Sequence, residues 1–469
     1  VTSMNFPTLM KWNVYRLDFI RPIRWMVALL DDEVLPIKIL DVAASNVSRG
    51  HRFLGSDTTI NSADEYEDKL REQFVIVDAN KRKETIVEQI KQIQDENNWV
   101  ININKGLLEE VNNLVEWPTA FFGKFEEKYL QLPSEVLITS MKDNQRFFYV
   151  TDKENQILPY FISVRNGNKD FIENVIAGNE KVLTARLEDA MFFYQEDQAK
   201  DIDFYVNKLK KVSFHDKIST IFEKMQRVEQ IASIIGKKAN LSDQELTDVK
   251  RAAQIYKFDL VTGMVGEFSE LQGVMGEKYA LIKGENESVA TAIREHYMPI
   301  SASGDLPETK VGSVLSLADK FDSILTFFAA GMIPSGSNDP YALRRQANGI
   351  VRIVKNEKLN FNLAELMNEL ISAENDANVA PKLDQTKEIS EIVSFIKDRI
   401  VKQMKSENIR HDIIDAAGNS QNDNIEFIFD VASVLEQHKD DAEFKESVEA
   451  LTRVLRISEK SDFAEDDLN

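Results

Sequence analysis

Strand-like patterns are confined to the first part of this chain, and this segregation is the feature that most limits what the chain can fold into. Residues 1–185 mix strand and helix patterns and hold all four tryptophans. Residues 186–355 are patterned almost entirely as helices, and residues 356–469 are acidic and helical. Strands gathered in one part and helices in the others are typical of α+β proteins. We therefore predict a multidomain α+β chain with these three zones as its domains.

Length and composition agree with several packed domains. At roughly 100–200 residues per domain, 469 residues predict two to four domains, and a hydrophobic fraction of 43% is enough for ordinary cores. The absence of cysteine excludes a disulfide scaffold, a thiolate zinc site and a cysteine nucleophile. No apolar run approaches the ~20 residues of a membrane helix and no signal peptide is visible, so we expect a cytoplasmic protein without a membrane partner.

Local patterns predict individual elements in the first zone. Residues 145–150 and 157–164 are rich in aromatic and β-branched side chains, and the polar run 151–156 between them indicates a hairpin. Ser62 and Glu65 have the spacing of a capping box at a helix start. Isoleucines at i, i+4 and i+7 then predict a helix. They are Ile86, Ile90 and Ile93.

The clearest predicted helix of the second zone begins at Ser242. Ser242 and Glu245 form a capping box. Apolar residues at helical spacing then extend one face of this helix to Met264. They are Leu246, Val249, Ala253, Tyr256, Leu260 and Met264.

Two more helix starts follow from cap residues. Asp339 is a predicted cap with Pro340 as the first residue of its helix, and Asn362 is a predicted cap in the third zone. A further helix of that zone carries a stripe of apolar residues at helical spacing. They are Ile389, Ile392, Ile396, Ile400 and Met404.

The common nucleotide and hydrolase motifs are missing from the sequence. It contains no GxxxxGK[ST] loop, no GxGxxG after a strand, no GxSxG elbow and no HExxH. We therefore expect no ATP site and no metal site built from a short motif on this chain.

The helical middle zone has the residue order of HD-type metal phosphohydrolases, in which histidines and aspartates hold a divalent metal. Asp259, His296 and Asp319 stand where that family has ligands. Lys224 takes the place of the first histidine, and Phe258 that of the histidine in the His-Asp pair. Because lysine is a poor ligand and phenylalanine is none, we predict an HD-like helical scaffold with a degenerate site and no metal. The alternative is a metal-dependent phosphohydrolase acting on nucleotides or phosphoesters, in which the three remaining ligands would bind a metal that activates water.

Arginines beside aromatic residues are a second sequence pattern that indicates a function. Arginines crowd the first 55 residues with Trp12 and Trp25 among them, and a second group follows the cap at Asp339. Arginine with aromatic residues is a pairing that binds nucleic acid through phosphate contacts, stacking and cation–π contact. The alternative is that these arginines donate hydrogen bonds to carbonyls and carboxylates of the protein itself. The candidate contacts are Arg21, Arg24, Arg49, Arg52, Arg146, Arg344 and Arg345.

Local charge is a better guide to the partner than net charge. The net charge of −21 argues against a general nucleic-acid coat. The first 55 residues, however, hold seven Lys and Arg against five Asp and Glu, a local balance of +2. A nucleic-acid partner therefore stays possible for the first zone.

Longer strings identify a family. They include FIRPIRWMVALL (19–30), VEWPTAFFGKFEEKYLQLPSEVLITSMKDNQRFFYV (115–150) and PSGSNDPYALRRQANGIVRIV (334–354). In these and further strings, which cover most of residues 6–355 in order, the chain resembles the beta subunits of bacterial heterotetrameric glycyl-tRNA synthetases. RHDIIDAA (410–417) is similar to the start of the anticodon-binding helical domain of arginyl-tRNA synthetases.

The resemblance implies a division of labour between two subunits. The alpha subunit of this enzyme type carries the active site for ATP, Mg²⁺ and glycine, and the beta subunit binds tRNA(Gly) in an α2β2 assembly. We therefore expect a glycine–tRNA ligase subunit that itself lacks the aminoacylation site and any cofactor.

The resemblance also implies the nature of each domain. Residues 1–185 would be a tRNA-binding body similar to the B subunit of tRNA-dependent amidotransferase, and 186–355 the HD-like domain. Residues 356–469 would be part of an anticodon-binding domain. Because the family carries sequence before Val1 and after Asn469, we expect a chain truncated at both ends.

Overall fold

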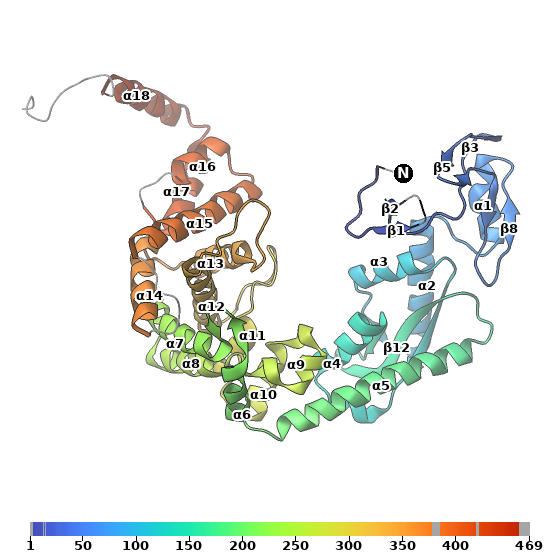
Figure 1. Cartoon of the computed structure of the whole chain (residues 1–469), viewed down its shortest axis with the longest axis horizontal. Helices are drawn as coiled ribbons and strands as arrows, with labels where there is room; N and C mark the ends of the chain where they lie inside the picture. The colour runs from blue at the N-terminus through green and yellow to red at the C-terminus, as the bar shows by residue number, and fades with distance from the viewer. Residues whose placement is uncertain (1–2, 13, 15, 378–384, 419–421, 459–469) are drawn as a thin grey trace, which may run out of the picture. The chain divides into compact units, whose positions relative to one another are not determined.

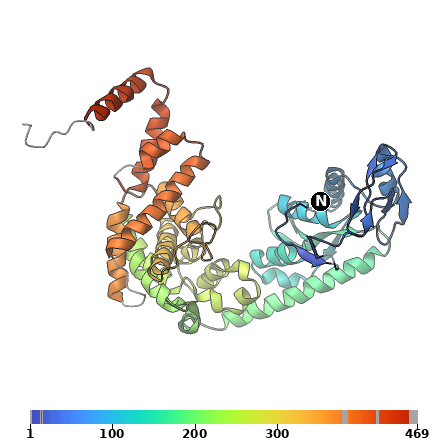
Figure 2. The same ribbon diagram turned by 45° about the horizontal axis from the view of Figure 1, so that its top comes forward.

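The computed structural model describes residues 3–12, 14, 16–377, 385–418 and 422–458. The chain divides into unit 1, Val1–Phe192, and unit 2, Phe193–Asn469. The division lies inside α5 (Ile172–Gln198), a helix of 27 residues that both views show unbroken (Figures 1 and 2). Strands predominate in the first half of unit 1, and the described residues of unit 2 are helical apart from one hairpin, which confirms a mixed α/β, multi-unit chain. No helix among the described residues is long and apolar enough to cross a membrane.

Unit 1 opens with short antiparallel strand pairs of two or three residues each. The pairs are β1 (Met10–Trp12) with β2 (Leu17–Phe19), β3 (Leu29–Leu30) with β4 (Glu33–Val34), β5 (Lys38–Ile39) with β6 (Val42–Ala43), and β7 (Val47–Arg49) with β8 (Asp57–Thr59). Turn η1 (Ala63–Glu65) and helix α1 (Tyr66–Glu72) follow. The predicted capping box here is half formed, because Ser62 accepts the Asp64 amide while Glu65 accepts the amide of Asn61.

The rest of unit 1 is built on one antiparallel sheet in the order β10-β12-β11-β9. Its core joins the sheet to α2 and α3, and Ile86 and Ile90 of α2 are fully buried in it, as predicted. The elements are α2 (Ala79–Asn97), β9 (Val100–Ile101), α3 (Lys105–Leu114), β10 (Pro118–Lys124), η2 (Glu127–Gln131), α4 (Ser134–Thr139), η3 (Ser140–Asn144), β11 (Phe148–Thr151) and β12 (Ile157–Asn166).

The predicted hairpin is confirmed as β11 paired with β12. Strand β11 begins at Phe148, three residues later than predicted. Residues 140–144 form the helical turn η3, and Arg146 has a φ of +59°, which interrupts an extended backbone.

Unit 2 is organised around α12 (Lys310–Ala329), whose residues 311–328 are all buried. A helix buried on every side must lie in the centre of its domain, and α12 packs against α7, α8, α11, α13 and α15. The remaining elements up to α12 are α6 (Ile202–Lys208), η4 (Leu209–Lys211), β13 (Ser213–His215), β14 (Ser219–Thr220), α7 (Ile221–Lys238), α8 (Asp243–Ile255), η5 (Phe258–Val261), α9 (Gly263–Glu267), η6 (Ser269–Leu271), α10 (Val274–Ile282) and α11 (Glu287–Glu295).

The last part of unit 2 is helical, as predicted. Asn362 caps α14 by accepting the Glu365 amide, which confirms that start. The predicted stripe lies on α15, where Ile392, Ile396, Ile400 and Met404 are buried. The helices are α13 (Leu343–Glu357), α14 (Leu363–Ala377), α15 (Gln385–Ser406), α16 (His411–Gly418), α17 (Ile425–His438) and α18 (Ala442–Ser458).

Two helix predictions were wrong in extent. The capping box of Ser242 and Glu245 starts α8, but the helix ends at Ile255 instead of reaching Met264. There the chain turns through η5, and Asp259 leaves the helix axis to accept two backbone amides. Asp339 accepts the amides of Leu343 and Arg344, so it caps α13 from a turn further back, and Pro340 lies outside the helix.

Candidate functional site

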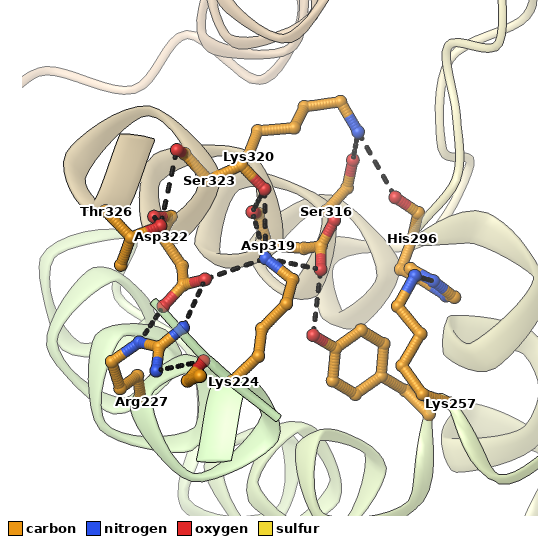
Figure 3. Close-up of polar contacts among 12 residues, drawn as sticks. Lys224, Arg227, Lys257, His296, Ser316, Asp319, Lys320, Asp322, Ser323 and Thr326 are labelled. Carbon is orange, nitrogen blue, oxygen red and sulfur yellow. Dashed lines mark hydrogen bonds and ion pairs between the residues drawn. The ribbon is translucent and has the colours of Figure 1, made fainter. Parts of the chain in front are cut away.

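The largest cluster of buried charge in the described structure lies between α7 and α12 in unit 2. A complete capping box of Thr220 and Glu223 starts α7 and fixes its register. Lys224 and Arg227 follow on α7, three residues apart, and so lie on the same face of the helix. Asp319 and Asp322 have the same spacing on α12. Figure 3 shows the two pairs pointing toward one another.

Short polar contacts join the two pairs. The Lys224 ammonium lies 2.7 Å from an Asp322 carboxylate oxygen and 3.3 Å from an Asp319 carboxylate oxygen. The Arg227 guanidinium is fully buried, and its Nε donates to Asp322 at 2.6 Å. Because both cations face buried carboxylates, the charges compensate one another away from water.

A second lysine lies on the far side of Asp319. The ammonium of Lys257 is 2.8 Å from Nε2 of His296. Burial lowers the pKa of His296 well below its ordinary value, and burial also lowers that of Lys257 to about 8. Nδ1 of His296 lies against the Ile293 carbonyl, so a neutral ring donates there and accepts from the ammonium at Nε2. The lysine thus occupies the imidazole nitrogen that a metal would use.

Asp319 is held between the two lysines. Burial raises the pKa of a carboxyl, but the charges of Lys224 and Lys257 outweigh it and keep the pKa of Asp319 well below its ordinary value. The hydroxyl of Tyr256 also donates to Asp319, at 2.8 Å. Asp319 is therefore an ionised carboxylate, and the contacts of Lys224 and Tyr256 are both to its Oδ1.

Lys320 is the third buried lysine of the cluster. Its ammonium donates to the carbonyls of His296 and Met298 and to Oγ of Ser316, at 3.2, 2.8 and 2.7 Å. Figure 3 shows the contacts with His296 and Ser316. Burial lowers its pKa to about 7. The lysine fixes the loop that follows α11 against α12.

The four residues of the predicted degenerate site are only partly together. Lys224 contacts Asp319, and His296 reaches them through Lys257. Asp259 instead accepts the amides of Gly273 and Gly276, at 2.6 and 3.1 Å, and so holds the start of α10. Phe258, in the place of the lost histidine, is a core residue with 1% exposure. Within the part of the chain that the structure describes, no group of three or more His, Cys, Asp or Glu residues could hold a metal ion.

The arginines of the first zone lie at the surface of unit 1. Arg21, Arg24, Arg49 and Arg52 are all exposed. The Arg49 guanidinium lies 5.0 Å from the ring centre of Trp25, which is the arginine–aromatic pairing expected from the sequence. None of the four forms an ion pair with a carboxylate of a described residue, so their charges are not neutralised inside the protein.

The other candidate arginines differ in burial and in the contacts that their side chains make. Arg146 donates to Glu110 at 2.8 Å and to two backbone carbonyls. Arg344 is half-buried and Arg345 is exposed on the first turn of α13. Arg345 faces the cavity beside the buried cluster, whereas Arg344 does not line it.

Comparison with known proteins decides the family. The family model described as glycyl-tRNA synthetase beta subunit matches residues 1–419. The glycine–tRNA ligase beta subunit of Levilactobacillus brevis is 60% identical over 461 residues, which cover 98% of this chain and 67% of that protein. The beta subunits of Limosilactobacillus reuteri and Lactiplantibacillus plantarum are 59% and 57% identical over 98% and 100% of this chain, and over 67% of their own lengths. This chain belongs to the glycyl-tRNA synthetase beta subunit family.

Membership of the glycyl-tRNA synthetase beta subunit family confirms the resemblance found in the sequence and disfavours the phosphohydrolase alternative. The geometry agrees, because all three ligands proposed for that hydrolase have other partners, and those of Asp319 are Lys224 and Tyr256. His296 is bonded to an ammonium, and Asp259 to backbone amides. The chain spans about two thirds of the length of these relatives.

Sequence reasoning missed Arg227, Lys257, Lys320 and Asp322 as members of the cluster. A pattern that could have revealed them was present in α12, where three charged residues interrupt a mostly apolar and otherwise uncharged stretch. Charged residues are almost never fully buried without a partner, so a charge inside a helix that is apolar on all faces predicts a buried polar cluster.

Proposed function

We propose that this beta-family chain is the tRNA-binding part of a glycine–tRNA ligase. The observation that carries the proposal is its identity of up to 60% to curated beta subunits along nearly its whole length. In this proposal the chain binds tRNA(Gly) and presents its acceptor end to a catalytic partner. The assembly is a cytoplasmic α2β2 heterotetramer.

The aminoacylation chemistry belongs to the partner in this proposal. The alpha subunit holds ATP, Mg²⁺ and glycine, and the beta chain contributes no cofactor. The lack of a phosphate-binding loop in the sequence supports this division.

The contacts to tRNA come from exposed arginines. Arg21, Arg24, Arg49 and Arg52 are the strongest candidates, because they are exposed and have no carboxylate partner among the described residues. An arginine without an internal partner can form a bidentate contact to a phosphate at little cost. Arg146 is a weaker candidate, because a contact to RNA competes with its bond to Glu110.

The helical part contributes two domains in this proposal. The HD-like domain, residues 186–355, acts as a scaffold, which the lysine-filled cluster supports. The helices of 356–469 form part of an anticodon-binding domain, and Arg344 and Arg345 lie close to the boundary between the two. Neither domain catalyses a reaction.

A filter-binding assay with tRNA(Gly) over a range of salt concentrations tests the proposal. We expect affinity at low salt that falls as salt rises, because bound phosphates release counterions. Changing both Arg49 and Arg52 to Gln lowers the affinity and reduces the slope of log affinity against log salt by about 1 for each arginine that bound a phosphate. Arg71→Gln, at another exposed arginine of unit 1, is the matched control.

Two results would contradict the proposal. One is the lack of any tRNA affinity at low salt. The other is a double variant whose affinity falls no further than that of the Arg71→Gln control.

A further inference from the structure

A cavity of about 540 Å³ lies beside the buried cluster in unit 2. Its walls come from α7, α12, α13 and the turns that follow α8 and α11. Four cationic side chains line it, against two carboxylates, Asp319 and Glu270. The cations are Lys224, Lys257, Lys320 and Arg345.

Two of these cations are saturated by the protein. An ammonium group has three N–H donors. Lys224 donates to Asp322, to Ser323 and to the backbone carbonyl of Asp319. Lys320 likewise has three acceptors, two carbonyls and a hydroxyl. These two lysines therefore offer no N–H donor to a ligand.

The other two cations keep donors for a ligand. Among the described residues, the ammonium of Lys257 has one hydrogen-bond acceptor, Nε2 of His296. The guanidinium of Arg345 makes no hydrogen bond to any described residue. Among the described residues, the five N–H groups of Arg345 and two of Lys257 therefore have no hydrogen-bond acceptor, although the Lys257 ammonium also lies 4.0 Å from the ring centre of Tyr297.

The two carboxylates of the cavity offset only part of the charge of its four cationic side chains. Asp319 is already engaged by Lys224 and by the hydroxyl of Tyr256. Glu270 is exposed, as Arg345 is, so water screens the charges of both. The cavity is therefore cationic, and it suits an anion rather than a metal ion.

We propose that this cavity binds a phosphate dianion through Lys257 and Arg345, either as inorganic phosphate or as the phosphate of a small monoester such as a nucleotide. A planar guanidinium matches two phosphate oxygens, and a lysine acts as a point charge on a third. Phe214, Ile221 and Leu260 add apolar wall, so there is room for a group attached to the phosphate. This site goes beyond tRNA binding by the surface of unit 1.

Isothermal titration in a buffer free of phosphate at pH 7 tests the site, with inorganic phosphate and AMP as separate probes. We expect saturable binding of at least one probe at one site per chain. AMP binding more tightly than phosphate identifies a nucleotide as the ligand, and equal affinities identify the phosphate group alone; both outcomes support the shared chemistry.

Two variants on adjacent residues of α13 locate the site. Arg345→Gln changes an exposed side chain that lines the cavity, and we expect it to weaken binding about tenfold, the value of one charge-assisted contact. Arg344→Gln removes the same charge one residue earlier, outside the cavity, and we expect it to leave the affinity unchanged.

The proposal is overturned by either of two results. The first is the lack of saturable binding of both probes at millimolar concentration. The second is an equal loss of affinity in the two variants, which would assign the effect to general surface charge. Circular dichroism of each variant shows that the compared proteins are folded.

Discussion

Replacing Asp322 by Asn is expected to destabilise unit 2 strongly and unit 1 hardly at all. Asp322 is fully buried, and it accepts from Lys224 at 2.7 Å and from Arg227 at 2.6 and 3.3 Å. An asparagine has almost the same volume, so the change removes charge without opening a cavity. It leaves Lys224 with one carboxylate, Asp319, and takes from Arg227 the carboxylate to which it donates.

The size of the effect follows from those contacts. Breaking a buried ion pair by removing one partner costs about 3–5 kcal/mol, because the remaining charge is buried and unpaired. Three charge-assisted hydrogen bonds at roughly 1.5–3 kcal/mol each set an upper bound on the loss of unfolding free energy. The loss is smaller than this bound, because the amide oxygen of asparagine still accepts some of these hydrogen bonds. With a urea m-value of about 3 kcal/mol/M, the unfolding midpoint of unit 2 should fall by roughly 1–2 M.

The sequence provides the assay with two separate probes. All four tryptophans lie in unit 1, so tryptophan fluorescence in urea reports on that unit. Far-UV circular dichroism reports mainly on the helices of unit 2. Asp322→Asn should move the circular dichroism transition and leave the fluorescence transition in place.

Controls decide whether the reasoning holds. Glu67→Gln breaks an exposed ion pair with Lys81 in unit 1 and should move neither transition. Asp322→Leu combined with Arg227→Met should be more stable than Asp322→Asn, because a buried pair replaced by apolar residues leaves fewer unpaired charges. A midpoint shift within experimental error for Asp322→Asn would refute the argument, as would an equal shift of the fluorescence transition.

Other properties of the chain can be tested in the same way. Burial lowers the pKa of Lys257 to about 8 and that of Lys320 to about 7, so above pH 8 the unfolded chain binds more protons than the folded chain. The unfolding free energy of unit 2, measured by urea titration, should therefore rise between pH 7.5 and about 9.5. A flat or falling profile would argue against these pKa shifts. Ser242→Ala removes a complete capping box and should cost about 1 kcal/mol in the circular dichroism transition, whereas an unchanged midpoint would show that the cap contributes nothing. Gly276→Ala should destabilise unit 2, because a Cβ there would lie 2.6 Å from an isoleucine methyl and 3.0 Å from an aspartate oxygen. Gly178→Ala in α5, where a Cβ meets no described atom within 4 Å, should instead stabilise its helix by roughly 0.5–1 kcal/mol. A Gly276→Ala variant more stable than the Gly178→Ala variant would contradict both expectations.

Local patterns predicted local structure well. The Ser242 capping box, the Asn362 cap and the hairpin of β11 and β12 depend on residues close together in the chain, and all three are confirmed. The extent of α8 was predicted wrongly, because apolar residues at helical spacing continue past Ile255 into other buried turns. Burial alone keeps the pattern apolar, so periodicity did not mark the end of the helix.

The buried cluster could be predicted only in part. The order of Lys224, His296 and Asp319 in the sequence indicated a degenerate site in the middle zone. The bond between Lys257 and His296 joins residues 39 positions apart, and no local pattern encodes it. Asp259 was assigned to the site by its position in the motif, but the amides of α10 compete for its carboxylate, and a sequence does not reveal that competition.

The lysine that occupies His296 has a consequence for how this unit depends on its surroundings. A bound metal ion leaves its site at a rate and to an extent set by its free concentration, so a metal-stabilised domain weakens when the metal is scarce. The ammonium of Lys257 is part of the chain and cannot dissociate, exchange or be chelated. The positive charge at this histidine therefore depends on pH through the lowered pKa of Lys257, about 8, and not on the free concentration of an ion.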